Sequence, residues 1–448
     1  MIPRRTLYIG VYLVALLIPV SLAVSGALYA RPAAAQGRLT ATPKPPRTTP
    51  SPTPIVTSTP APTATPTPGD PGEPGAWVLV DSPNVAGRNN RFNGLAVVSA
   101  DDVWAVGEHY NANASNLQTL AMRWDGSDWD IVSSPNPDTG RNRLLGVAAV
   151  SPDDVWAVGV AGGTAGPDWY SLVLHWNGSA WSNVPAPQVG PPGTSELHGV
   201  AALAADDVWA VGAYSTPDTG WWDQPLVLHW DGSEWINIPA PAFGSTSKLN
   251  AVVAVAPDDV WAVGTALENN WKTLVLHWDG EAWTRVTSPN LGIAGNTLLG
   301  LAAVSATDVW AVGTANNGNS TLTLHWNGSE WSLVPSPNGT ARPGINRNVL
   351  QAVTAIAADD VWAVGVQAYS TVGGAGQPIY FGFALIEHWD GAAWTEVAVP
   401  PLPGTGEDGA LAGVDAAASG DVWAAGSYYE PDFDTQTYRT LIERYMLP

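Results

Sequence analysis

Short apolar runs, separated by turn sequences, recur along the chain from Trp77 to its end. In the unit 249–289 the first two runs carry apolar residues on both faces, which is typical of strands covered on both sides, and a third run, "TLVLHW", follows them. An Asp-Gly pair, the dipeptide most typical of a tight hairpin turn, precedes a fourth run. We therefore expect four antiparallel strands in this unit, at residues 251–256, 260–264, 273–278 and 282–289.

The second run of this unit belongs to a repeated heptapeptide. The sequence "DDVWAVG" begins at residues 101, 153, 206, 258 and 359, "TDVWAVG" begins at 307, and "GDVWAAG" begins at 420. Their central tryptophans are 49 to 61 residues apart, a period found in propellers and solenoids. The repeats have no helical period, which excludes helical solenoids. Small sheets that are apolar on both faces become covered when they pack radially against one another.

The two ends of the repeat region predict how such a ring closes. The last copy stops at "ERYMLP", directly after its third strand, so its fourth strand is missing. The sequence "GAWVLVDSPN" at 75–84 matches the fourth-strand sequence "EAWTRVTSPN" at 281–290. We therefore predict an all-β fold: a seven-bladed β-propeller of four-stranded antiparallel blades, in which the N-terminal strand completes the C-terminal blade.

The order of motifs within a unit resembles that of the kelch family. In kelch repeats an aspartate-bearing turn leads through a Trp and a Pro-containing stretch to a strand that ends in Gly-Gly, and here "DGSEWINIPAP" leads to "DDVWAVG". The resemblance covers residues 76–448 and implies a kelch-like bacterial secreted propeller. The chain departs from kelch in having one Gly instead of two, and Trp where kelch usually has Tyr. The "WDGSEW" hairpin is similar, more weakly, to the Asp-box of sialidases, which keeps a residue between Asp and Gly.

The sequence before the repeats divides into two segments. Arg4 and Arg5 precede a 24-residue run without charge and an alanine-rich site, so residues 1–37 are predicted to be a signal peptide or a signal anchor. Residues 38–75 are rich in Pro and Thr, cannot bury a core, and predict a disordered stalk. We therefore expect the propeller, at 76–448, to be secreted or anchored to the outer face of the cell membrane. Contact with the membrane is expected only through the N-terminal segment.

Composition limits the chemistry that this chain can perform. Its 448 residues include no Cys, which excludes disulfides, thiolate nucleophiles and Cys-ligated metals. The formal net charge is −22, and residues 77–448 carry 12 Lys and Arg against 38 Asp and Glu, a net charge of −26. So acidic a surface repels phosphate backbones, and we expect no nucleic-acid partner. We also expect a monomer without a cofactor.

The repeats separate scaffold residues from candidate site residues, because a residue present in every unit serves the unit. The Asp pair of "DDVW" is interpreted as turn residues that bond their own backbone, rather than as calcium ligands. The His of "HW" occupies a strand position that Arg123 and Arg444 fill in two units, which is not expected of a metal ligand. No metal site is therefore predicted.

Four of the 24 tryptophans fall outside the repeat pattern, and all four lie between the second and third strands. Tyr and Phe gather in the same segments, which vary in sequence and length and emerge on one rim of a propeller. Exposed aromatic loops on a rigid scaffold are typical of a binding face. The alternative, that these rings only pack the longer loops together, stays open. The candidate ligand-binding residues are Tyr110, Trp169, Tyr170, Tyr214, Trp221, Trp222, Trp271, Tyr380, Phe381 and Tyr429.

The sequence singles out no catalytic residue, since it contains neither an "HExxH" motif nor a serine elbow. A glycosidase or lyase pair is defined by separation in space, and ten unrepeated carboxylates of this rim are candidates for it. They are Glu108, Asp168, Glu196, Asp218, Asp223, Glu268, Asp408, Glu430, Asp432 and Asp434. The unrepeated arginines of the same rim are interpreted as surface residues: Arg88, Arg91, Arg141, Arg143, Arg342 and Arg347.

These observations favour a recognition propeller that binds carbohydrate, because flat rings beside Asp, Asn and Glu suit the faces and hydroxyls of sugars. A protein ligand on the same rim is a second possibility. Two alternatives stay open: a polysaccharide-active enzyme (a glycosidase or lyase) on this rim, and a structural protein-interaction module. The structural module predicts a rim without a concave pocket.

Overall fold

The computed structural model describes residues 75–85, 88–110, 116–163, 169–189, 194–339, 347–372, 378–402, 408–418, 420–431 and 436–445. Within them the chain forms 28 strands and one short 3-10 turn, η1 (Asn316–Gly318). The predicted export segment, 1–37, and all but the last residue of the predicted stalk, 38–75, lie outside the described residues. In the described part, no helix has the length and hydropathy needed to cross a membrane.

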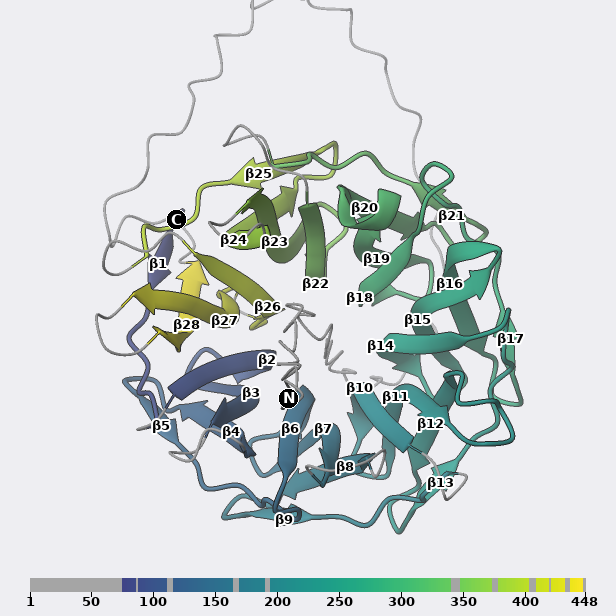
Figure 1. Ribbon diagram of the computed structural model, residues 1–448, viewed down its shortest axis with the longest axis horizontal. Helices are drawn as coiled ribbons and strands as arrows, with labels where there is room; N and C mark the ends of the chain where they lie inside the picture. The colour runs from purple at the N-terminus through teal and green to yellow at the C-terminus, as the bar shows by residue number, and fades with distance from the viewer. Residues whose placement is uncertain are drawn as a thin grey trace, which may run out of the picture.

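The strands repeat in sets of four, and Figure 1 shows these sets arranged around a centre, with the first strand of each set innermost and the fourth outermost. The first strands are β2 (Arg88–Ser99), β6 (Arg141–Ser151), β10 (Thr194–Ala204), β14 (Ser247–Ala256), β18 (Thr297–Ser305), β22 (Arg347–Ala357) and β26 (Gly409–Ala416). The second strands are β3 (Asp102–Tyr110), β7 (Asp154–Gly162), β11 (Asp207–Ser215), β15 (Asp259–Glu268), β19 (Asp308–Ala315), β23 (Asp360–Val372) and β27 (Val422–Pro431). The third strands are β4 (Leu117–Trp124), β8 (Trp169–Trp176), β12 (Gln224–Trp230), β16 (Asn270–Trp278), β20 (Ser320–Trp326), β24 (Pro378–Trp389) and β28 (Gln436–Tyr445). The fourth strands are β5 (Trp129–Ile131), β9 (Trp181–Asn183), β13 (Trp235–Asn237), β17 (Trp283–Arg285), β21 (Trp331–Leu333), β25 (Trp394–Val397) and β1 (Trp77–Leu79).

The prediction of repeated four-stranded antiparallel sheets in an all-β propeller is confirmed. Five sheets have four strands each, and a sixth has eight, because one parallel bridge between Leu117 and Arg141 joins the sets β2–β5 and β6–β9. In the unit 249–289, β14, β15 and β16 extend three or four residues further toward the strand 2–3 hairpin than predicted. Backbone pairing continues there although the apolar run has ended.

A close backbone approach explains the glycine that ends each heptapeptide. The pairing of β14 with β15 shifts register between Leu249 and Ala251, opposite this glycine. A Cβ atom on Gly264 would lie 2.0 Å from the carbonyl oxygen of Lys248, and the equivalent glycines of the other six sets show distances of 1.9 to 2.0 Å. No side chain fits at such a bulge, so each sheet requires Gly at this position.

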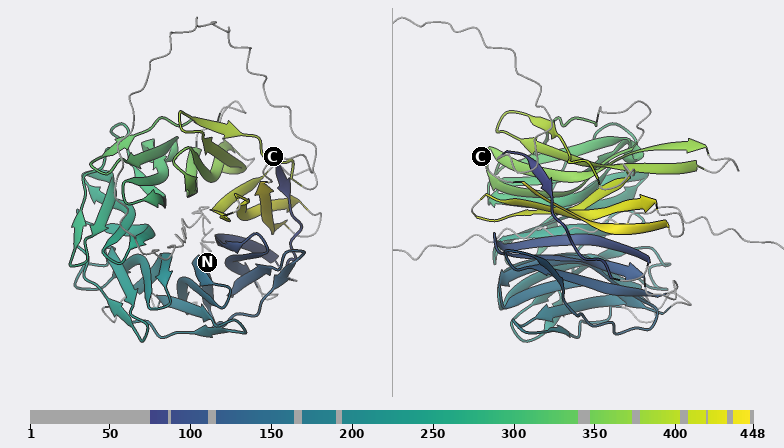
Figure 2. Two further views of the ribbon diagram at one scale, coloured as in Figure 1. Left: turned by 180° about the vertical axis from the view of Figure 1, so that it is seen from behind. Right: turned by 90° about the vertical axis from the view of Figure 1, so that its left-hand side faces the viewer.

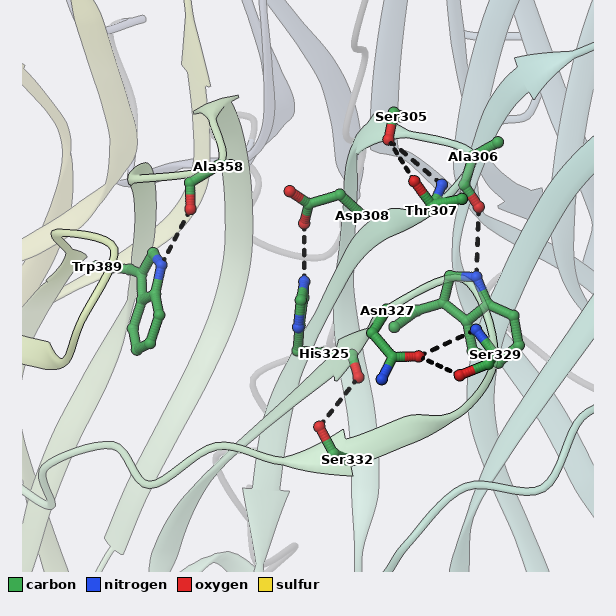
Figure 3. Close-up of polar contacts among 11 residues, drawn as sticks. Ser305, Ala306, Thr307, Asp308, His325, Asn327, Ser329, Ser332, Ala358 and Trp389 are labelled. Carbon is green, nitrogen blue, oxygen red and sulfur yellow. Dashed lines mark hydrogen bonds and ion pairs between the residues drawn. The ribbon is translucent and has the colours of Figure 1, made fainter. Parts of the chain in front are cut away.

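The second aspartate of each heptapeptide joins the second strand to the third. His325 Nε2 lies 2.8 Å from Asp308 Oδ1 (Figure 3). His175, His229, His277 and His388 make the same contact at 2.8 to 2.9 Å, and Arg123 and Arg444 replace the histidine at 2.8 and 3.3 Å. The interpretation of both aspartates as residues that bond their own turn is therefore wrong for the second one. The second aspartate contacts a His or Arg side chain of the third strand, and the sequence alone does not show that these two strand positions lie side by side.

Aromatic triads hold neighbouring sheets together. Trp261 of β15 packs against Trp326 and Trp331 of the next sheet, with ring centroids 4.9 and 5.6 Å apart. The first pair is tilted and the second is edge to face, and such aromatic contacts add to the stabilisation that burial of the rings provides. Equivalent triads centre on the other second-strand tryptophans: Trp104 with Trp176 and Trp181, Trp156 with Trp230 and Trp235, Trp209 with Trp278 and Trp283, Trp310 with Trp389 and Trp394, Trp362 with Tyr445 and Trp77, and Trp423 with Trp124 and Trp129.

The N-terminal strand completes the last sheet, as predicted. β1 pairs with β28 in antiparallel register, with Trp77 opposite Tyr445 and Leu79 opposite Glu443, and Figure 1 shows the two strands side by side. The Trp77 side chain is only 5% exposed. Beyond the ladder, Ser82 Oγ lies 2.8 Å from Thr440 Oγ1. The first and last described segments are thus joined by backbone pairing, ring packing and a hydroxyl contact.

Two buried carboxyl groups interrupt the apolar pattern of the third strands. Glu387 and Glu443 occupy the position that is Leu174, Leu228, Leu276 and Leu324 in other sets, and both side chains are fully buried. Within the described residues neither carboxyl oxygen of Glu443 has a hydrogen-bond partner. Burial raises the pKa of Glu443 to about 8, and burial together with Glu396 raises the pKa of Glu387 well above its ordinary value. Burial thus favours the neutral form of both carboxyl groups in the folded protein.

Candidate ligand-binding site

The strand 2–3 hairpins emerge on one side of the disc. In the side view of Figure 2, the hairpins of β23 with β24 (light green) and β27 with β28 (yellow) extend to the same side, opposite the C-terminal end. The links from each fourth strand to the next first strand reach this side as well, because the first strands run away from it. We call this side the variable rim.

Among the described residues of the variable rim, the four unrepeated tryptophans are the most exposed rings. Trp169 and Trp271 begin or nearly begin their strands and are both 38% exposed. Trp221 and Trp222 are 49% and 54% exposed in a turn that is closed by a 2.9 Å bond from Trp221 N to Thr216 O. The Arg141 guanidinium lies 5.7 Å from the Trp169 ring. The four tryptophans thus lie in three hairpins of the variable rim, and all of them are partly exposed to solvent.

The remaining predicted residues are less available. Tyr170 and Tyr214 pack partly buried against apolar clusters between sheets, and the rings of Tyr429 and Tyr438 meet edge to face at 5.7 Å. Tyr110 ends β3 half-buried. The side chains of the last two candidates, Tyr380 and Phe381, lie outside the described residues. The ten candidates come from six of the seven strand sets, so they surround the rim.

A cavity of about 580 Å³ lies beside Trp271. Three consecutive strand sets contribute its walls: β14–β17, β18–β21 and β22–β25. The lining residues are Lys248, Asn250, Thr265, Trp271, Gly295, Thr297, Leu299, Thr314, Asn317, Gly318, Asn319, Arg347 and Val349. Its volume is within the range of small-molecule sites, and it brings one exposed predicted ring together with polar and cationic groups.

Hydrogen bonds fix the wall beside Trp271. Gly295 N donates to Asn317 Oδ1 at 2.9 Å, and Asn317 N donates to Gly295 O at 3.0 Å. Asn317 has a φ of 60°, a left-handed conformation that Asn tolerates better than most residues. Asn296 N donates to Trp271 O at 3.0 Å. The link between β17 and β18 is therefore tied on one side to η1 and on the other to the Trp271 strand, which preorganises the cavity.

Most polar groups of the lining are already engaged. Thr265 Oγ1 lies 3.1 Å from the Asn296 carbonyl oxygen, and Thr314 Oγ1 lies 2.9 Å from the Asn348 carbonyl oxygen. Asn250 is fully buried, and its Nδ2 donates to Leu298 O at 2.7 Å. Its Oδ1 has no hydrogen-bond partner among the described residues. One buried acceptor is therefore left without a donor, which is costly unless something supplies one.

The charged residues of the described lining are both cations, Lys248 and Arg347. This is unexpected in a region of net charge −26. Arg347 begins β22 beside Gly318, where an added Cβ would lie 3.8 Å from Arg347 Cγ. Arg347 is therefore a partly buried residue of the cavity lining, which its interpretation as a surface residue did not foresee. Arg342, which was interpreted in the same way, lies outside the described residues.

Lys248 also acts on two carboxyl groups of the neighbouring set. Burial by itself raises the pKa of Glu196, but His198, Lys248 and Arg143 outweigh burial and lower the pKa to about 2. Burial raises the pKa of Asp223. The positive charge of Lys248 offsets only part of this increase, and the negative charge of Glu196 adds to it. His198 Nε2 lies 2.9 Å from Glu196 Oε1. The pKa of Glu196 thus lies below its ordinary value, and the pKa of Asp223 lies above its ordinary value.

Several other candidate carboxylates serve structural contacts. Glu108 accepts from Asn93 Nδ2 at 2.6 Å and contacts Arg143, and Glu430 pairs with Arg439 at 2.7 Å. Glu268 pairs with Arg285, and Asp408 accepts from Gly382 N. Asp168, Asp432 and Asp434 lie outside the described residues. The described residues contain no group of three or more His, Asp or Glu placed to hold a metal ion.

Sequence reasoning found Trp271 but missed the cavity and its two cations. The rarity of lysine could have pointed to Lys248, because the chain has only three lysines. The equivalent first-strand positions hold Arg91, Arg143, Glu196, Thr297, Val349 and Ala410, so this position varies from set to set. Applying the repeat comparison to charged residues as well as to tryptophans would have singled it out.

Comparisons with known proteins concern the fold. No family model and no curated protein sequence matches the chain. Among solved structures, the chain is similar to YCF48 bound to D1 peptide, with 14% identity, a TM-score of 0.47, and coverage of 83% of this chain and 95% of that one. It is similar to the GH74 xyloglucanase from Xanthomonas campestris, with 12% identity, a TM-score of 0.49, and coverage of 81% and 55%, so it spans about half of that enzyme. It is also similar to the six-bladed fucose-recognising lectin of Aleuria aurantia, with 14% identity, a TM-score of 0.42, and coverage of 70% and 97%.

Proposed function

We propose that this protein is a recognition propeller that binds carbohydrate in the cavity beside Trp271. The carrying observation is the cavity itself: the partly exposed Trp271 indole lines it, and a buried acceptor, Asn250 Oδ1, has no donor among the described residues. A sugar ring offers an apolar face for the indole and hydroxyl donors for the acceptor. A peptide ligand on the same rim remains the competing occupant.

The propeller architecture and location belong to the same proposal. The sets β2–β5 and β6–β9 are joined only through one bridge, so we count them as two blades of a seven-bladed, kelch-like ring. Seven inter-sheet aromatic triads support this count. An export segment and stalk at residues 1–75 would present a monomeric ring outside the cell, secreted or tethered to the membrane.

Replacing Trp271 with Ala is expected to weaken glycan binding by about thirtyfold, since truncating a central aromatic contact costs about 2 kcal/mol or more. The whole chain would be screened on a glycan array, and the affinity of the best ligand measured by calorimetry. Trp169→Ala is the matched control, because Trp169 has the same exposed fraction on another set and lies outside the cavity lining. Equal losses in both variants, or none in Trp271→Ala, would contradict the proposed site.

A polysaccharide-active enzyme is the second candidate, favoured by one observation. Glu196 and Asp223 interact electrostatically, with the pKa of one lowered to about 2 and the pKa of the other raised, as in an acid and nucleophile pair. Glycosidase activity on polysaccharides that the array identifies should then fall at least about a hundredfold in both Glu196→Gln and Asp223→Asn. Release of reducing ends at the same rate in both variants would exclude this pair.

A purely structural module predicted a rim without a concave pocket. The cavity beside Trp271 argues against that alternative.

A further inference from the structure

We infer that the ligand of the Trp271 cavity is an acidic saccharide, whose carboxylate is bound between Lys248 and Arg347. This inference rests on the proposed carbohydrate function and adds the chemical class of the sugar. It concerns the described lining, in which these two residues carry the charge.

The charge of the cavity is opposite to that of the protein. Residues 77–448 carry a net −26, yet no carboxylate is among the described lining residues. A site for a neutral sugar gains nothing from two cations in a hollow, where each cation loses part of its hydration. A ligand carboxylate compensates this loss, because charge-assisted hydrogen bonds are stronger than neutral ones.

Arg347 differs from the ion-paired arginines of the fold. Arg123, Arg143, Arg285, Arg439 and Arg444 each have a carboxylate within 4.0 Å. Within the described ranges Arg347 has no such partner, and its Nε is buried without a hydrogen bond. Its planar guanidinium suits a carboxylate in two-point contact. The carboxylate that the fold supplies to these five arginines is thus left to a ligand here. Arg91 and Arg141 also have no carboxylate within 4.0 Å among the described residues, but they lie against the Tyr438 and Trp169 rings instead.

Lys248 is not neutralised by a contact in the described part of the chain either. It influences Glu196 and Asp223 at a distance, but no carboxylate there lies within 4.0 Å of its ammonium group. Glu196 is already paired with His198. Lys248 and Arg347 belong to first strands of sets that flank the β18–β21 set from opposite sides, so their positive charge faces one hollow from two walls.

The neutral groups favour a sugar acid over a simple anion. Asn250 Oδ1 needs a hydrogen-bond donor, which a carboxylate or an unprotonated phosphate cannot provide and a hydroxyl can. The Trp271 face needs an apolar surface, which a pyranose ring provides. One monosaccharide unit with both hydroxyls and a carboxylate satisfies all four residues.

The test uses polygalacturonate and its methyl ester, which share a backbone and differ in charge. The whole chain should bind the acid form at least about tenfold more tightly than the ester, and this preference should shrink in high salt. The double variant Lys248→Met/Arg347→Met should lose the preference while keeping its melting temperature. Arg141→Met is the matched control, because Arg141 holds the equivalent first-strand position of another set and lies beside Trp169.

The outcomes separate the two claims. Equal binding of acid and ester, lost in Trp271→Ala, would overturn the acidic ligand and leave the carbohydrate site intact. A preference for acid that survives in Lys248→Met/Arg347→Met would also overturn it. Failure to bind either polymer or any glycan on the array, with binding of peptides that have a free terminal carboxylate, would overturn the carbohydrate function itself.

Discussion

Deletion of residues 1–82 is expected to lower the free energy of unfolding by at least about 4 kcal/mol, whereas deletion of residues 1–74 should leave it unchanged. The longer deletion removes β1, which pairs with β28 over three residues and covers Trp362 and Tyr445 with the buried Trp77 ring. Losing a buried Trp costs about 3–5 kcal/mol, and the lost ladder bonds add to this. Thermal and denaturant unfolding of both truncated chains would measure the difference.

The point variant Trp77→Ala in the whole chain separates ring packing from strand pairing. It should account for most of the loss, because Trp77 completes the aromatic triad around Trp362. Equal stability of the two truncated chains would mean that closure through β1 contributes nothing to the ring.

Glu443→Gln is expected to stabilise the protein by about 5 kcal/mol at pH 8 and to have little effect at pH 4.5. The folded pKa of Glu443 is about 8 against an ordinary 4.5, so the unfolded chain releases this proton at lower pH than the folded chain does. Stability therefore falls as pH rises from 4.5 to about 8, by about 1.4 kcal/mol per pH unit. Unfolding measured from pH 4.5 to pH 9 would show this slope in the wild type and its reduction in the variant.

Glu443→Leu restores the residue that four other sets have at this position, and it should be at least as stable as Glu443→Gln at pH 8. Glu387, whose pKa is also raised, keeps its own contribution to the slope in both variants. If the dependence of stability on pH is the same in Glu443→Gln as in the wild type, the pKa of Glu443 is not raised in the folded protein and the prediction is wrong.

Particular residues explain why so much of the fold could be predicted. The glycine of each heptapeptide is required by a bulge, and the Asp-Gly or Asn-Gly of each hairpin by a positive φ, as at Gly280. Seven copies of the first requirement and six of the second define strand order. The match of Trp77 to Trp283 then predicted closure, because a fourth-strand tryptophan completes every inter-sheet triad.

The candidate site was only partly predictable for a different reason. Trp271 was a candidate because it breaks the repeat, but three other tryptophans break the repeat as well. Only the tertiary structure shows that Trp271 lines this cavity and that the other three do not. Tyr170 and Tyr214 also break the repeat, yet they pack between sheets. An irregular aromatic residue can serve either a loop core or a ligand, and sequence alone does not distinguish the two.

The sequence by itself determined the repeated four-stranded sheet, the strand order and the N-terminal strand that completes the last sheet. These depend on backbone conformation and on interfaces that recur between like neighbours, so every copy carries the information. The tertiary structure alone decided which histidine or arginine meets each aspartate, that Glu443 is buried without a partner, and that Lys248 and Arg347 line one cavity. Those contacts join strands or sheets across as many as 99 positions of the chain, and their chemistry depends on distance and burial, which no repeat records.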